Sequence, residues 1–219
     1  MLYKDYIMRM IQQMTVFLAR IMGLKASGDI EEAQKVMNEA LELFSGLSEG
    51  ALLKLSPSDL IKLMGGLDEV NANKYLMFAE LLKVKGDLFR SEGDSEKAYE
   101  LYHKSFKIYN TVLVSSYGTS LKSHCGQLNE LVMNLRKYAL PFDTQKNIMN
   151  YFEMVGEYAK AEDVLYEILK SEINKSDMIS EGQAFYKRLL EKSPEELESG
   201  GLPLSEVEEG LQLLANKNN

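Results

Sequence analysis

The chain contains one cysteine, Cys125, which directly follows His124, one of only two histidines. A cysteine activated by a nearby base could act as a nucleophile. Neighbouring residues of a helix point about 100° apart, however, so His124 would be poorly oriented to take the thiol proton. We therefore expect a partly buried structural thiol and a surface histidine. We predict that no hydrolytic or redox activity depends on Cys125.

The sequence also lacks several motifs typical of cofactor and metal sites. The P-loop, G-x-G-x-x-G and H-E-x-x-H motifs, which bind phosphates, dinucleotides and zinc, are absent. One cysteine and two histidines, His103 and His124, are too few for a typical structural zinc site. We expect no catalysis, no metal and no cofactor. An enzyme that uses an unrecognised carboxylate site is the less favoured alternative.

The composition favours a helical protein of the cytoplasm. Hydrophobic residues make up 45% of the 219 residues, and only four prolines interrupt the chain. A single cysteine forms no intramolecular disulfide, which fits a reducing compartment. The longest uncharged run near the N-terminus, Met10 to Ala19, has ten residues, whereas a membrane span needs about 20. We expect neither a signal peptide nor a membrane segment.

The charge of the chain argues against a nucleic-acid partner and marks out its C-terminal end. The net charge is −8, and no segment carries the dense lysine and arginine that phosphate binding requires. From Ser193 onward the chain has six glutamates and one lysine, a net charge of −5. We predict a helical domain over residues 1–192 and an acidic linker and helix over 193–219, able to dock on that domain.

Apolar residues recur at helical spacing along the whole chain, which predicts about ten helices and no sheet. The first stripe has a spacing of four and three residues: Tyr3, Ile7, Met10, Met14, Phe17, Ile21 and Leu24. A second stripe, Ile11, Leu18 and Met22, widens its apolar surface. We expect this N-terminal helix either to lie centrally in the fold or to mediate self-association.

A glycine and an alanine stand five residues apart at three places in the chain. The three pairs are Gly28 with Ala33, Gly93 with Ala98, and Gly156 with Ala161. Each glycine is followed by an acidic residue. Glycine allows a helix to end sharply, the acid caps the next helix, and a small alanine lets the two helices approach closely. The pattern therefore predicts three helix hairpins.

The second hairpin resembles the tetratricopeptide-repeat (TPR) family. The matching residues are Leu82, Gly86, Phe89, Gly93, Ala98 and Tyr102. The resemblance implies a right-handed array of antiparallel helix hairpins, with a generic helical bundle as the alternative. The turn glycines lie 65 and 63 residues apart, about twice a TPR period, so the array would be divergent. The opening segment, through Ala33, is also similar to an uncharacterised bacterial family of about this length.

The TPR resemblance also implies candidate partner-binding residues. In such arrays the first helix of each hairpin lines the concave face, and in some members a lysine and an asparagine one turn apart bind the C-terminal carboxylate of a peptide. Lys146 and Asn150 occupy the matching positions of the third hairpin, and Lys83 and Asp87 those of the second. An ordinary solvated helix surface is the alternative for all four residues.

The predicted function is a non-catalytic protein- or peptide-binding module, a scaffold or adaptor. Lys146 and Asn150 suggest an acidic or C-terminal peptide as ligand, and the acidic segment from Ser193 is one candidate, acting as an autoinhibitory plug. The alternative is a sensor or regulator that binds a small molecule or peptide inside the superhelix. An enclosed apolar pocket would favour the sensor, whereas an open groove with a mixed polar lining would favour the adaptor.

Overall fold

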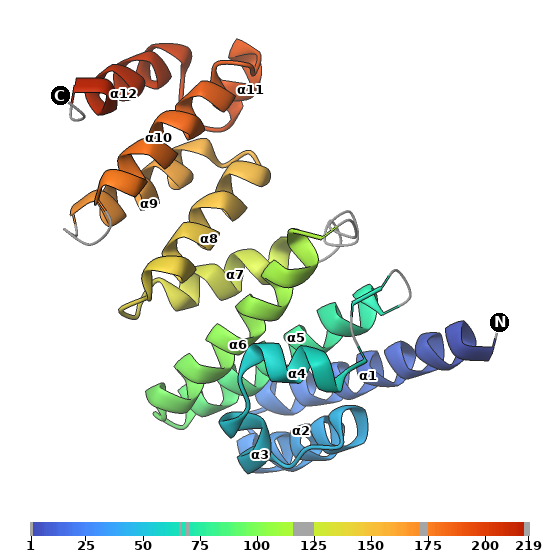
Figure 1. Cartoon of the computed structure of the whole chain (residues 1–219). Helices are drawn as coiled ribbons and strands as arrows, with labels where there is room; N and C mark the ends of the chain where they lie inside the picture. Colours follow the sequence, from blue (N-terminus) through green and yellow to red (C-terminus); the bar gives the residue numbers. More distant parts are fainter. Residues whose placement is uncertain (1, 66, 69–70, 116–124, 171–174, 217–219) are drawn as a thin grey trace. The chain divides into compact units, whose positions relative to one another are not determined.

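The described part of the chain folds into helices and turns, with no strand, as the periodicity predicted (Figure 1). The computed structural model describes residues 2–65, 67–68, 71–115, 125–170 and 175–216. Its helices are α1 (Leu2–Ala26), α2 (Ile30–Ser45), α3 (Glu49–Lys54), α4 (Pro57–Leu63), α5 (Ala72–Ser91), α6 (Ser95–Leu113), α7 (Cys125–Leu135), α8 (Phe142–Met154), α9 (Tyr158–Lys170), α10 (Lys175–Leu189), α11 (Pro194–Ser199) and α12 (Leu204–Asn216). His124 lies outside these residues.

The chain divides into two compact units, residues 1–138 and 139–219. This differs from the division after residue 192 that the sequence suggested. The acidic C-terminal segment is not a separate part, because α11 and α12 pack together and α12 packs along α10. The change of composition at Ser193 marks a surface rich in glutamate rather than a boundary between domains.

The three predicted hairpin turns are present at the expected glycines. Gly28, Gly93 and Gly156 have φ angles of +83°, +85° and +81°, in the left-handed region that favours glycine. They join α1 to α2, α5 to α6, and α8 to α9. The three alanines five residues later, Ala33, Ala98 and Ala161, are fully buried. Both features confirm the register predicted from the glycine–alanine spacing.

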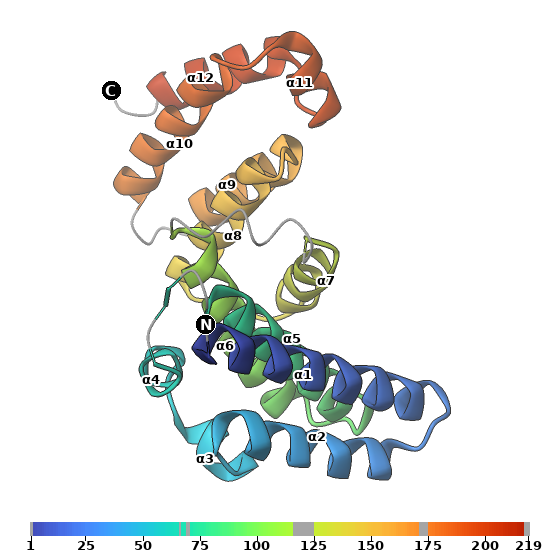
Figure 2. The ribbon, with the colours of Figure 1, turned by 90° about the vertical axis from the view of Figure 1, so that its right-hand side faces the viewer.

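Helix α5 is the centre of the first unit. It packs against α1, α2 and α6, and its residues from 75 to 89 are buried with two exceptions at positions 77 and 80. The close approach of α6 depends on Gly86, because a methyl group there would lie 2.7 Å from the Tyr102 ring. Buried Lys85 binds Asn38 of α2 and Glu49 of α3. Figure 2 shows α1 and α2 lying side by side in this unit.

Helix α3 was not predicted from the sequence. Its N-cap is Ser48, whose hydroxyl accepts a hydrogen bond from the Ala51 amide, and Leu52 is its buried residue. Six residues give too few turns for an apolar period to be visible, so the burial of one leucine and the capping serine decide the conformation.

Close approaches at glycines also build the second unit. A methyl group at Gly182 of α10 would lie 2.5 Å from Leu214 of α12, and one at Gly210 of α12 would overlap the Tyr186 ring. The Gln183 side chain donates a hydrogen bond to the Leu214 carbonyl. Helices α10 and α12 therefore form a further packed pair, after the α8–α9 hairpin.

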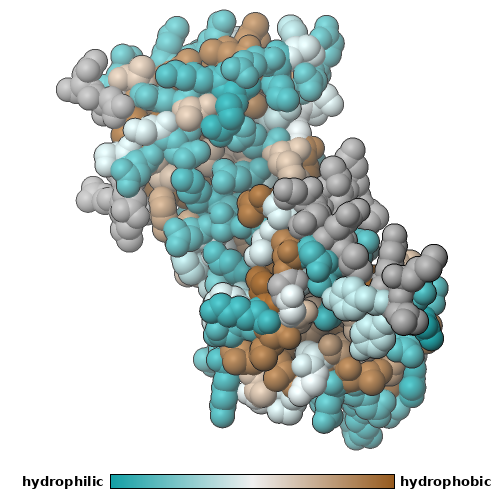
Figure 3. Space-filling model, turned by 45° about the vertical axis from the view of Figure 1, so that its right-hand side comes forward, coloured by the Kyte–Doolittle hydropathy of each residue, from teal (hydrophilic) through white to brown (hydrophobic). Residues whose placement is uncertain are grey.

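Helix α1 packs against both α2 and α5 and still exposes apolar side chains. Tyr6, Met8, Val16 and Met22 are all exposed. Figure 3 shows apolar surface on the part of the molecule that the first unit forms. Self-association through α1 stays a prediction. Within the described ranges, we find no helix whose length and apolar character would allow it to cross a membrane.

Candidate functional site

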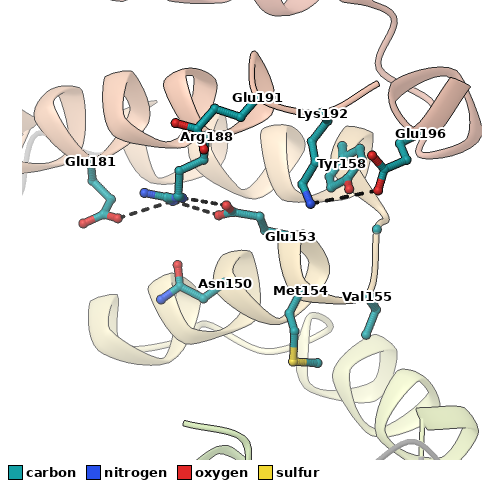
Figure 4. Close-up of a pocket in the computed structure, with 11 residues that line it drawn as sticks. Asn150, Glu153, Met154, Val155, Tyr158, Glu181, Arg188, Glu191, Lys192 and Glu196 are labelled. Atoms are coloured by element: carbon teal, nitrogen blue, oxygen red, sulfur yellow. Dashed lines mark hydrogen bonds and ion pairs between the residues drawn. The ribbon is translucent and has the colours of Figure 1, made fainter. Parts of the chain in front are cut away.

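An open groove of about 850 Å³ lies between α8 and α10 of the second unit (Figure 4). Its lining residues are Asn150, Glu153, Met154, Val155, Gly156, Tyr158, Glu181, Arg188, Glu191, Lys192 and Glu196. The walls are thus the first helix of the α8–α9 hairpin, the helix α10 that follows, and α11 at one end. The lining mixes charged, amide and apolar side chains.

The centre of the groove is an ion pair that joins its two walls. Arg188 of α10 donates two hydrogen bonds to Glu153 of α8, at 2.6 Å and 2.8 Å. The hydrogen bonds to Glu153 raise the pKa of Arg188 further above its ordinary value. The planar guanidinium and the carboxylate fit each other in this two-bond geometry, which orients both side chains along the groove.

The two predicted residues of α8 lie at this groove in different ways. Asn150 is exposed and lines it, and Figure 4 shows its side chain directed towards the side of Glu153 and Arg188. Lys146, one turn earlier, forms an ion pair with Glu181 of α10 at 2.8 Å. The structure therefore places the amide in the groove, but it pairs the lysine with a carboxylate of the chain itself.

The end of the groove is built by the acidic segment that we considered as a plug. Ser193 and Glu196 form a capping box that starts α11, and Glu196 lines the groove. The Gly200 carbonyl accepts a hydrogen bond from the Ala159 amide of α9, which fastens α11 beside the hairpin turn. This segment therefore forms a wall of the groove and does not fill it.

The other two predicted residues, Lys83 and Asp87, lie in a cleft of about 400 Å³ in the first unit. The cleft is lined by residues of α1, α5 and α7, among them Met22 and Glu130. Met22 occupies the position in the first hairpin that Asp87 occupies in the second hairpin. The hairpin register thus correctly brings Met22 and Asp87 to one recess of this unit.

Lys83 and Asp87 are buried, and they bind each other rather than solvent. The Lys83 ammonium lies 3.0 Å from Asp87 and 2.7 Å from Glu130. Asp87 also accepts a hydrogen bond of 2.7 Å from the Tyr102 hydroxyl and lies 3.3 Å from the Lys25 ammonium. Each charge in the cleft therefore has partners from other helices, so the network joins α1, α5, α6 and α7.

Burial and pairing act in opposite directions on the pKa values of this network. Burial lowers the pKa of Lys83, but the hydrogen bond to Glu130 and the charge of Asp87 raise it more. Burial raises the pKa of Asp87, but the Lys83 charge and the Tyr102 hydrogen bond lower it more. Both groups are therefore held in their charged forms.

The sequence comparison gives a family for the whole chain. The model of a family of unknown function (DUF6483) matches residues 1–219. The chain belongs to this family. No curated protein and no solved structure matches the chain.

The residues that form the centre of the groove in this DUF6483 chain were not predicted from the sequence. Glu153 and Arg188 come from different helices, and neither stands in a local motif. One pattern could have singled out α10. Gly182 and Phe185 have the same three-residue spacing as Gly86 and Phe89 in α5.

Glu80 in the same cleft gives a prediction for stability against pH. Burial raises the pKa of Glu80, although the Tyr109 hydroxyl donates a hydrogen bond to its carboxylate. A raised pKa in the folded state means that this group stabilises the fold fully below its ordinary pKa of 4.5. That contribution is lost as the pH rises through the raised value.

We expect Glu80→Gln to be more stable than the parent protein at neutral pH. Glutamine keeps an acceptor for Tyr109 and removes the buried charge. Urea unfolding at a series of pH values should show the difference shrinking as the pH falls through the raised pKa of Glu80 towards 4.5, with nothing left of it below that value. A stability difference that does not change with pH would show that burial of the Glu80 charge is not its cause.

Proposed function

We propose that the chain is a non-catalytic adaptor whose TPR-like hairpins bind a peptide segment of another protein. The observation that carries this proposal is the α8–α10 groove, which is open and has a mixed polar lining. An open groove with exposed amide and charged side chains suits an extended peptide better than an enclosed small molecule.

The TPR-like architecture is part of the same proposal. The left-handed turn glycines and the buried alanines support it, as does the close approach of Gly86 to Tyr102. The positions of the recesses also support it. The groove is lined by α8 and α10, and the cleft of the first unit by α1, α5 and α7. Of these helices, α1, α5 and α8 are the first helices of their hairpins, and in a TPR-like array the first helices form the concave, ligand-binding face.

The proposal is tested by blocking the groove in a protein that still folds. Asn150 is exposed on α8, so Asn150→Trp should fold normally and fill part of the groove. Gln212→Trp, at an exposed position of α12, is the matched control. Peptides would be selected on the full chain from a random display library and their dissociation constants measured by calorimetry.

We expect selected peptides to bind at least about tenfold more weakly to Asn150→Trp than to the parent, which corresponds to about 1.4 kcal/mol. Gln212→Trp should bind as the parent does. If the library yields no binder, or if both variants bind every selected peptide equally well, the groove is not a peptide site and the proposal fails.

A further inference from the structure

We propose that the α8–α10 groove takes a basic segment, with lysine or arginine side chains of the partner bound by the exposed carboxylates of Glu191 and Glu196 at the α11 end. This inference rests on the proposed peptide-binding function and names the chemistry of the partner. The proposed ligand is basic, whereas the sequence suggested an acidic one.

The first argument is the balance of charge in the groove. Its lining contains four glutamates, one arginine and one lysine, a net charge of −2. Lys146, beside the groove, is bound to Glu181, one of these four. Even with Lys146 included, the negative charges exceed the positive ones. A basic segment therefore complements the groove, whereas an acidic one would be repelled.

The second argument is that Arg188 in the groove and Lys146 beside it are already bound. Arg188 gives two hydrogen bonds to Glu153, and Lys146 lies 2.8 Å from Glu181. At either of these cations a ligand carboxylate would have to displace a glutamate; the remaining cation of the lining, Lys192, lies 4.0 Å from Glu196 at the α11 end. Since the exchanged partners are chemically alike, the exchange gains little energy.

The third argument is that the carboxylates at the α11 end are available. Glu191 is exposed, and its carboxylate has no ion-pair or hydrogen-bond partner among the described residues. Glu196 is also exposed, and its contact with Lys192 is long, at 4.0 Å. An incoming ammonium or guanidinium can therefore bind either carboxylate without breaking a short ion pair.

The test uses three synthetic peptides of equal length that share one pattern of apolar residues. At the remaining positions the first carries lysine, the second glutamate and the third glutamine. Each is labelled with a fluorophore and titrated with the full chain by anisotropy at low and at physiological salt. We expect the lysine peptide to bind most tightly and to weaken with salt, because screening reduces exposed ion pairs. The glutamate peptide should bind most weakly.

The variant that removes the site is Glu191→Gln with Glu196→Gln. Glutamine at position 196 can still form the capping box of α11, so the fold is kept. The matched control is Glu208→Gln with Glu209→Gln, which makes the same change of charge at exposed positions of α12 outside the groove. The lysine peptide should bind about threefold to tenfold more weakly to the first variant than to the parent protein. Its affinity for the control variant should equal that for the parent.

The outcomes separate this inference from the proposed function. Tighter binding of the glutamate peptide, or equal weakening by both double variants, would overturn the basic-segment inference. If library-selected peptides lose affinity on Asn150→Trp but are neutral or acidic, the inference fails and the peptide-binding function stands. If no peptide depends on Asn150, both fail.

Discussion

Replacing Asp87 by alanine is expected to destabilise the first unit by about 3–5 kcal/mol, the usual cost of removing one partner of a buried ion pair. The Asp87 side chain is only 4% exposed and is in contact with Lys83, Lys25 and Tyr102. Its loss leaves the Lys83 ammonium buried with Glu130 alone. Denaturant unfolding of the full chain, followed by circular dichroism, measures the change.

Asp163→Ala, at an exposed position of α9, is the control and should stay within about 0.5 kcal/mol of the parent. The Asp87 contribution also has a definite pH dependence. Because pairing lowers the pKa of Asp87, its stabilisation is present above the ordinary value of 3.8 and is lost as the pH falls towards the lowered one. A loss of stability in Asp87→Ala that is unchanged at low pH would contradict this account of the network.

Replacing Gly200 by alanine is expected to destabilise the second unit by about 3 kcal/mol, at the upper end of overpacking effects. A methyl group at this position would overlap the Tyr158 ring and lie 2.5 Å from the Gly156 carbonyl oxygen. The ring can move, but the backbone of the α8–α9 turn cannot move without breaking the bond from Ala159 to Gly200.

The control for this substitution is Gly23→Ala, at an exposed position within α1 where a methyl group meets no atom within 4 Å. It should stabilise the protein by about 0.5–1 kcal/mol, because alanine favours a helix more than glycine does. Calorimetric unfolding of both variants measures the two effects. If Gly200→Ala melts like the parent, α11 is not fastened to the hairpin turn as described.

The parts of the fold that local chemistry specifies could be predicted from the sequence. A glycine with positive φ, an acid directly after it and an alanine at the helix contact lie within six residues of one another, and the acid caps the next helix at Asp29 and Asp94. Gly28, Gly93 and Gly156 were therefore found at the expected turns. The close contact of Gly200 with the Tyr158 ring could not be predicted in this way, because it depends on another hairpin.

The candidate site could be predicted only in part, for the same reason. The residues that register along one helix singled out do lie at recesses: Asn150 lines the groove, and Lys83 and Asp87 line the cleft. Their role in binding a partner stays a prediction. Whether a charged side chain is free depends on residues from other helices. Glu130 of α7 is bound to Lys83, and Glu181 of α10 is bound to Lys146. Neither pairing has a pattern in the sequence.

A fluorescence measurement tests the central claim, that the α8–α10 groove binds a peptide, most directly. The chain has no tryptophan, so a single introduced tryptophan reports on its own position. Met154, at the edge of the groove, and Met133, on α7, are 51% and 52% exposed, which makes Met154→Trp and Met133→Trp a matched pair. The account predicts that a library-selected peptide shifts the emission of Met154→Trp and leaves that of Met133→Trp unchanged. An unchanged Met154→Trp spectrum at saturating peptide would contradict it.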